Sequence, residues 1–275
     1  MEGESNQTHK EVCLFASGGM KFLVFIDVIT LLIGKPVMTK LLWITVASKK
    51  PADILNLNLA LFHNLQYYVC MLHLVFLHVW PSVQAHVLKV LLVYAQTGGP
   101  MSLCLITVER YVAVIHPTSF YLLSRYRVRE AAAVAVWLMS VNVALVTLDG
   151  STRLSDIIVK TLPMCVMVVM SAVMLWCSMH VARALMKSGP GGDKLHPMKR
   201  RAFRTVCATN NISLFCYVPV AAMQRFRFVD EGWYDCTLTP LCIMLLSAAS
   251  VVHPLFYLFT QGELFACFRQ RKKAG

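Results

Sequence analysis

The chain has 275 residues, of which 57% are hydrophobic and only 15% are charged. Soluble domains carry about 45–50% apolar and about 25% charged residues, so this composition excludes a water-soluble globule and a disordered chain. The net charge of +12 would suggest a nucleic-acid partner for a soluble protein, but in a membrane protein such an excess marks cytoplasmic loops. We therefore expect no nucleic-acid partner. The ten cysteines are too dilute for a disulfide scaffold.

Seven apolar stretches are each at least about as long as the roughly 20 residues that cross a bilayer as a helix. The first, Met20–Ala47, carries Lys21, Asp27, Lys35 and Lys40. A cleaved signal peptide is the alternative for this stretch, although the leader is acidic and no A-x-A site follows. The other six are free of Asp, Glu, Lys and Arg: Ile54–Leu88, Val90–Val108, Ala131–Leu148, Thr161–Ala182, Thr205–Gln224 and Cys236–Gly262. We predict an all-α membrane protein, a seven-transmembrane helix bundle.

The loop charges predict how the bundle is oriented. The loops after spans 1, 3 and 5 and the carboxyl tail carry 17 Lys and Arg residues against 5 Asp and Glu, whereas the other side carries 7 against 8. Basic loops stay in the cytoplasm, so we expect the amino terminus outside the cell and the carboxyl terminus inside. Asn6 begins a glycosylation sequon in the outer tail, in agreement with this orientation. The basic run Lys199–Arg201 is interpreted as a cytoplasmic anchor or as a docking surface for a partner or anionic lipid.

The third span ends in Glu109-Arg110-Tyr111, and His116-Pro117 follows. An acid and an arginine at the inner end of a helix can form a two-state latch, broken when the arginine finds another partner. With its position at the end of the third of seven spans, this motif resembles the signature of rhodopsin-like (class A) G-protein-coupled receptors. That family has seven helices, an outer ligand pocket and an inner G-protein site.

The resemblance extends along the chain. Trp137 is similar to the family's fourth-helix tryptophan, and the segment with Tyr217 and Pro219 resembles its sixth-helix hinge. His253-Pro254-Leu255-Phe256-Tyr257 resembles the seventh-helix N-P-x-x-Y motif. Pro51, Asn58 and Pro163 also fit, and Leu258–Arg271 looks like the short amphipathic eighth helix.

The resemblance implies a role for each motif. Arg110 would be the inner latch, Glu109 its resting partner and Tyr257 its partner in the active state. Pro219 and Pro254 would either only kink their helices or also serve as hinges, and both interpretations stay open. The expected division is an extracellular tail at 1–19, a seven-transmembrane receptor domain at 20–258, and helix 8 with a cytoplasmic tail at 259–275.

Departures from the family pattern define an interior polar site. His63 stands in the place of the second-helix aspartate, His253 in that of the seventh-helix asparagine, and Gly99 in that of a third-helix polar residue. The family's sodium pocket therefore lacks its anionic ligand, and a neutral imidazole is a poor partner for a hard cation. Lys35 stands near the first-helix asparagine and is expected to face the same cavity. The two histidines are interpreted as a hydrogen-bonded pair, as a pH switch or as a zinc site without an obvious third ligand. We expect no metal and no cofactor.

The family's disulfide between the third helix and the second outer loop has no counterpart here. By resemblance to some peptide and nucleotide receptors, Cys13 and Cys236 could instead join the amino-terminal tail to the third outer loop, since the exterior is oxidising. Cys267 is either a palmitoylation site or an ordinary interfacial cysteine.

Two ligand classes of the family are excluded. Leu92 replaces the aspartate of amine receptors, and Ser247 replaces the retinal-binding lysine of opsins. Arg225 and Arg227 end the sixth span on the outer side. They are either solvated loop arginines or contacts for a carboxylate or phosphate ligand.

These observations predict a plasma-membrane receptor, not an enzyme, that transmits binding of an extracellular ligand to a heterotrimeric G protein. Membrane lipid and a second copy of the receptor are further candidate partners. The alternatives are a small transporter or channel that uses the intramembrane charges, and a receptor-like protein that does not signal on its own.

Overall fold

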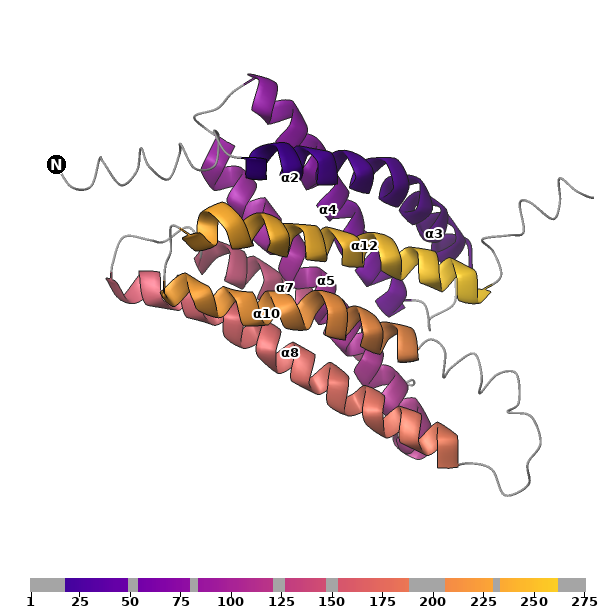
Figure 1. Cartoon of the computed structure of the whole chain (residues 1–275). Helices are drawn as coiled ribbons and strands as arrows, with labels where there is room; N and C mark the ends of the chain where they lie inside the picture. The colour runs from indigo at the N-terminus through magenta and orange to yellow at the C-terminus, as the bar shows by residue number, and fades with distance from the viewer. Residues whose placement is uncertain are drawn as a thin grey trace, which may run out of the picture.

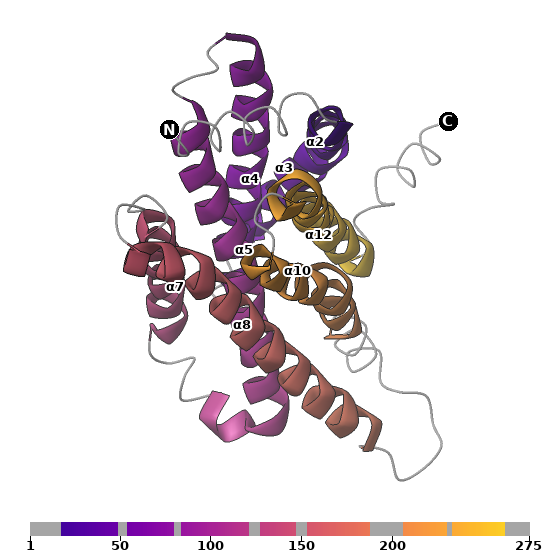
Figure 2. The same ribbon diagram turned by 60° about the vertical axis from the view of Figure 1, so that its left-hand side comes forward.

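The computed structural model describes residues 18–48, 54–79, 84–120, 127–146, 153–187, 206–229 and 233–261. Within these residues every regular element is helical, and the long helices lie against one another in one bundle (Figures 1 and 2). The predicted all-α membrane fold is therefore confirmed. The predicted eighth helix lies almost wholly outside the described residues, which end within α12.

The first three membrane-crossing segments occupy the amino-terminal half. Their elements are α2 (Gly18–Ile29), the π-helical turn η1 (Thr30–Gly34), α3 (Lys35–Ser48), α4 (Ile54–Val79) and α5 (Gln84–Ile115). The expected second span, Ile54–Leu88, is too long, because it covers all of α4 and the first residues of α5. Its 35 residues exceed what one crossing needs, and Pro81 stands in the sequence between the two helices.

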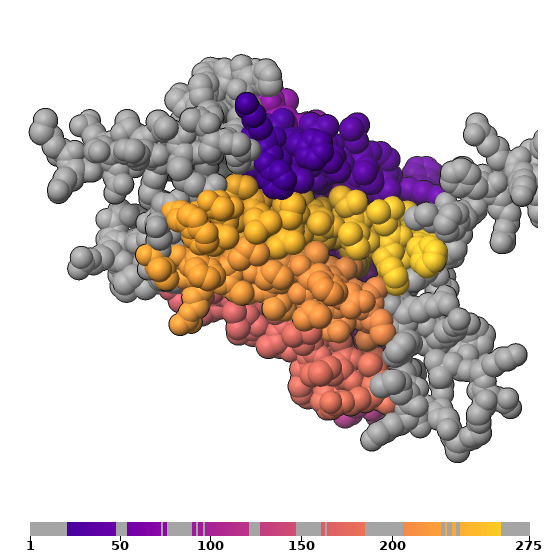
Figure 3. Space-filling view, viewed as in Figure 1, coloured from indigo at the N-terminus to yellow at the C-terminus, as the bar shows by residue number. Residues whose placement is uncertain are grey.

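The carboxyl-terminal half supplies four further rods. They consist of α7 (Val128–Val146), α8 (Arg153–Lys187), the helical run 206–212 continued by η3 (Ser213–Tyr217), α10 (Val218–Met223) and η4 (Gln224–Phe228), and finally η5 (Tyr234–Leu238) with α12 (Thr239–Gln261). Figure 3 shows α12 between α2 and α3 on one side and the segment containing α10 on the other. The central helix of the bundle is α5, which packs against α4, α7 and α8.

Three π-helical turns have a common cause in the sequence. Each of η1, η3 and η5 ends two residues before a proline, namely Pro36, Pro219 and Pro240. Proline lacks a backbone N–H, and its ring clashes with the carbonyl four residues earlier. That carbonyl falls inside the π-helical turn in all three cases. The wider turn therefore moves the carbonyl away from the proline ring and lets the helix continue.

The surface composition agrees with a membrane environment. Six helices of the described chain are long and apolar enough to cross a membrane: Lys21–Ala47, Val93–Ile115, Val128–Val146, Met164–Ala184, Val206–Phe226 and Thr239–Phe259. The remaining long helix, α4, has 26 residues and carries several Asn, His and Gln residues among its apolar ones. Large apolar side chains such as Trp43 (78% exposed) and Phe215 (67% exposed) point outward. In lipid such exposure carries no hydrophobic penalty.

Polar side chains join the helices inside the bundle. Asn58 of α4 donates through Nδ2 to the Ser102 hydroxyl of α5 at 2.9 Å, and its Oδ1 accepts from Trp137 Nε1 of α7 at 2.6 Å. The Trp137 ring also stacks on Phe62, with ring centroids 4.4 Å apart. Asn58 is 4% exposed, so both of its amide atoms need partners. These bonds fix how α4, α5 and α7 are rotated and shifted relative to one another.

Candidate functional sites: an interior cavity and the inner end of α5

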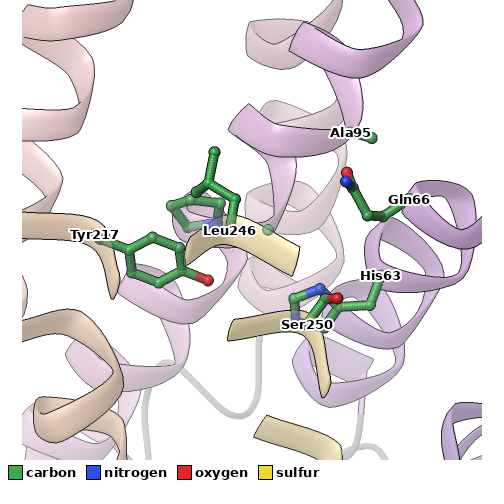
Figure 4. A pocket seen from close by; sticks show the side chains of 8 residues that line it. His63, Gln66, Ala95, Tyr217, Leu246 and Ser250 are labelled. Atoms are coloured by element: carbon green, nitrogen blue, oxygen red, sulfur yellow. The ribbon is translucent and has the colours of Figure 1, made fainter. Parts of the chain in front are cut away.

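A small cavity lies inside the bundle where α4, α5, η3 and α12 meet. Its volume is about 10 Å³, near the lower limit for one water molecule. Figure 4 shows the Tyr217 phenol and the His63 imidazole extending toward the same space. Its lining residues include His63, Gln66, Gly99, Tyr217, Leu246 and Ser250.

The two histidines of the expected polar site do come together. The His63 and His253 ring centroids are 5.9 Å apart and the rings are tilted by 44°. His63 is 5% exposed, and Nδ1 of His253 is buried without a hydrogen-bond partner. The described residues contain no group of three or more His, Cys, Asp and Glu side chains that could hold a metal ion. The geometry thus places the two rings side by side, without the direct hydrogen bond of the first of the three interpretations.

Two glycines of α5 shape this region. A Cβ at Gly98 would overlap the Phe62 ring, so only glycine fits between α4 and α5 there. A Cβ at Gly99 would lie 3.5 Å from His63 Cε1, which is an ordinary contact. Gly99 therefore supplies no oxygen ligand to the cavity but leaves room beside the His63 imidazole.

Lys35 does not line this cavity, contrary to our expectation. Its Nζ donates to Asn64 Oδ1 at 2.7 Å and lies 3.9 Å from the centroid of the Tyr68 ring. The neighbouring residue, Gly34, faces Tyr67, whose hydroxyl donates to the Ser250 carbonyl at 2.8 Å. Successive residues of a helix point in different directions. Gly34 therefore faces the interior of the bundle beside Tyr67, whereas Lys35 contacts Asn64 and Tyr68 on α4. A charge-assisted bond and a cation–π contact thus satisfy the intramembrane lysine.

The second candidate site lies at the carboxyl-terminal end of α5. Glu109, Arg110 and Tyr111 fall within the last two turns of that helix, which ends at Ile115. The Glu109 carboxylate pairs with Arg129 Nη2 of α7 at 2.6 Å, with side chains only 14% and 17% exposed. Arg110 is exposed, and within the described residues no ion pair involves it. The expected Glu109–Arg110 pair is therefore absent, and Glu109 pairs with Arg129 of α7 instead.

Tyr111 belongs to an aromatic cluster between α5 and α8. Its ring centroid lies 5.1 Å from that of Trp176 and 6.2 Å from that of His180, and Trp176 and His180 are 4.5 Å apart. Tyr111 also contacts His116, with centroids 5.9 Å apart. This cluster packs the carboxyl-terminal end of α5 against α8.

The remaining site residues lie at the π-helical turn η3, just after it, or within α12. Tyr217 is 2% exposed at the end of η3, Pro219 is half-buried two residues later, and Pro254 lies buried within α12. Tyr257 packs against the cluster that contains Met38 and Leu41 of α3.

The candidate outer and lipid-linked residues are described only in part. Arg225 is exposed in η4 at the far end of its rod. Arg227 belongs to the same turn and Cys236 to η5, but their side chains lie outside the description, as do Asn6, Cys13 and Cys267. The proposed glycosylation, disulfide and lipidation sites therefore stay predictions.

Sequence reasoning did not single out Arg129, Phe120 or Gln66. Arg129 is one of four arginines between the third and fourth predicted spans and has no local feature that identifies it as the partner of Glu109. Gln66 lies three residues after His63 on α4, so the helical repeat could have placed it on the same face. Its amide Nε2 is buried without a partner.

The family model described as "7 transmembrane receptor (rhodopsin family)" matches residues 37–257, which is most of the chain. The protein therefore belongs to the rhodopsin family of seven-transmembrane receptors, and it is a multi-pass membrane protein. The matched region contains both the cavity and the Glu109–Tyr111 motif. A search of curated proteins found no match to the chain.

Proposed function

We propose that this receptor couples binding of an extracellular ligand to activation of a heterotrimeric G protein through the inner end of α5. The observation that carries the proposal is the exposed Arg110 within Glu109-Arg110-Tyr111, at the end of a helix that the family match covers. A guanidinium offers a planar set of donors that suits backbone carbonyls or carboxylates of a partner. Glu109 is held by Arg129, so it does not cover this group.

The proposed orientation rests on charge. The loops on the side of Arg110 carry most of the Lys and Arg residues, which favours the cytoplasm for that side and the exterior for the amino terminus. We place the receptor in the plasma membrane, where an extracellular ligand and a cytoplasmic G protein can both reach it.

The proposed mechanism is a population shift between two packings of the bundle and needs no covalent chemistry. The π-helical turn before Pro219 and the proline inside α12 are places where a helix can bend with little loss of hydrogen bonding. Tyr217 connects the first of these bends to the cavity. A ligand that binds one packing more tightly would move the inner end of this rod relative to α5.

The proposed ligand class follows from the arginines at the opposite end of the bundle. Arg225 is exposed at the outer end of its rod, so it can reach an anionic ligand by a charge-assisted bond. Arg227 follows two residues later in the same 3₁₀ turn. We propose a carboxylate or phosphate group as the feature recognised there.

The deciding experiment measures G-protein activation in cells that express the receptor or its Arg110→Ala variant at equal surface density. We expect wild-type signalling above that of untransfected cells and its loss in the variant. Arg127→Ala is the matched control, because that arginine is also exposed and lies in the neighbouring turn before α7. Signalling that survives Arg110→Ala would contradict the proposed contact. Solute flux that persists without G proteins would favour the transporter alternative.

A further inference from the structure

The ion pair between Glu109 and Arg129 is unlike the other pair near it. Its two side chains are 14% and 17% exposed and 2.6 Å apart, whereas Arg127 and Glu130 are 3.8 Å apart with side chains 90% and 52% exposed. Exposed pairs contribute little, because water and salt screen them. The sheltered pair is screened less, so its geometry is held more strongly.

Arg129 is also held from a second side. Its guanidinium carbon lies 5.3 Å from the centroid of the Phe120 ring. Phe120 ends a helical turn that continues from α5, since the Phe120 N–H donates to the His116 carbonyl at 3.0 Å and the His116 N–H donates to the Val112 carbonyl at 2.9 Å. The carboxylate at the end of α5 and the ring after it thus hold one guanidinium between them.

This arrangement determines which arginine pairs with the Glu109 carboxylate. Glu109 has two candidate partners, its neighbour Arg110 and the more distant Arg129, and the structure shows it bound to Arg129. A carboxylate committed to one guanidinium in a bond this short is less available to a second. Arg110 stays exposed as a consequence.

We propose that Arg129 is a positioning residue that keeps Glu109 away from Arg110 and so keeps Arg110 available to a cytoplasmic partner. Its effect on signalling rests on the proposed function, but its effect on Arg110 itself does not. Loss of Arg129 leaves the half-buried carboxylate without its partner, and Arg110 is the nearest cation along the helix. Arg129 therefore sets the resting state of the Arg110 latch.

The direct test measures how fast Arg110 reacts with phenylglyoxal, a reagent for arginine guanidinium groups, in the detergent-solubilised full chain. Mass spectrometry of the peptide that contains Arg110 gives the rate. We expect Arg129→Gln to slow modification roughly threefold, the size of effect that a partly exposed ion pair provides. Glu109→Gln in the same chain should restore the wild-type rate, because no carboxylate then remains to capture Arg110.

The double variant separates positioning from a purely structural role. If Arg129 had only a structural role, Arg110 would be modified as slowly in the Glu109→Gln/Arg129→Gln double variant as in Arg129→Gln alone. An unchanged Arg110 rate in Arg129→Gln, or a double variant that stays slow, would overturn the proposal. Arg129→Lys keeps the charge and should keep a rate near that of wild type, which tests the inference even where the glutamine variant folds poorly.

A measurement of G-protein activation tests the inference together with the proposed function. Basal G-protein activation at equal surface density should fall in Arg129→Gln, recover in the Glu109→Gln/Arg129→Gln double variant and stay unchanged in Arg127→Gln. If the Arg110 rates follow the expected pattern but Arg110→Ala leaves signalling intact, the proposed function fails and the positioning role stands. If Arg110→Ala abolishes signalling but the rates do not change, the positioning role fails alone.

Discussion

Single polar side chains inside the bundle have defined partners on neighbouring helices. Asn58 links three helices through two hydrogen bonds, and Lys35 binds Asn64 and the Tyr68 ring. Hydrogen bonds between membrane helices contribute on average about 0.6 kcal/mol and at most about 1.7 kcal/mol each. Each bond is modest, but together they select one rotation of each helix about its axis. Apolar contacts with lipid and with neighbouring helices are too similar in energy to make that selection.

The closest approach of α4 to α5 depends on a single glycine. We expect Gly98→Ala to destabilise the receptor by about 1–3 kcal/mol, because the added methyl group must displace the buried Phe62 ring. For a chain of this size that corresponds to a fall in Tm of several degrees, on the order of 2–4 °C per kcal/mol. The fall is measured by thermal unfolding of the detergent-solubilised receptor.

Gly99→Ala is the matched control for this prediction. Its methyl group would make only an ordinary contact with the His63 ring, so its Tm should stay near that of wild type. Equal losses in the two variants would show that helix propensity or general packing, and not the Phe62 contact, sets the effect.

At the scale of elements, prolines determine where the helices depart from α-helical geometry. The three π-helical turns precede Pro36, Pro219 and Pro240 at the same spacing. In contrast, α5 and α12 continue as α-helix through Pro100 and Pro254. The same residue type therefore produces a wide turn in some contexts and a plain helix in others. Only the turn before Pro219 contributes a side chain, Tyr217, to the cavity.

Replacing Pro219 tests whether the turn before it acts as a hinge. Alanine restores a backbone N–H and removes the ring that the wide turn avoids, so η3 should become regular α-helix and the rod should stiffen. We expect a gain in stability of about 1 kcal/mol, a part of what proline costs inside a helix, with a rise in Tm of about 2–4 °C and a several-fold loss of G-protein activation. Thermal unfolding and the cell assay measure the two effects.

Pro240→Ala provides the comparison at the outer end of the last rod. It removes an equivalent π-helical turn that contributes no side chain to the cavity, so it should raise stability and leave signalling unchanged. Retained signalling in Pro219→Ala would contradict the hinge interpretation and leave only a kink.

The central helix joins the two candidate sites. Gly99 borders the cavity and Arg110 lies at the inner end of the same helix, eleven residues further on. A helix rises about 1.5 Å per residue, so the two positions are about 16 Å apart along a rigid rod. Contacts at the cavity and at the carboxyl-terminal end of α5 therefore act on one body.

At the scale of the whole molecule, the unequal distribution of charge predicts an odd number of crossings. A tag at the amino terminus should bind antibody on intact cells, and a tag at the carboxyl terminus should bind only after permeabilisation. Fluorescence of cells with and without detergent measures both, and an internal cytoplasmic protein serves as the permeabilisation control. Labelling of both tags on the same face would contradict seven crossings.

Much of the fold could be predicted without tertiary information. A bilayer requires long apolar segments whose backbone groups bond within the segment, so uncharged runs predict helices directly. The rule fails where a run exceeds one crossing, as in Ile54–Leu88, because composition alone does not show where one helix stops and the next begins. The Glu109–Tyr111 motif and the proline positions likewise follow from local sequence.

The amino-acid sequence alone thus determined the membrane class, the order of the spans and the family. The tertiary structure decided which side chains meet: Glu109 with Arg129, Lys35 with Asn64, and Tyr217 with His63 at the cavity. These pairings depend on how each helix is rotated and shifted against its neighbours. Such rotations arise from packing and hydrogen bonds summed over distant residues, so no local pattern encodes them.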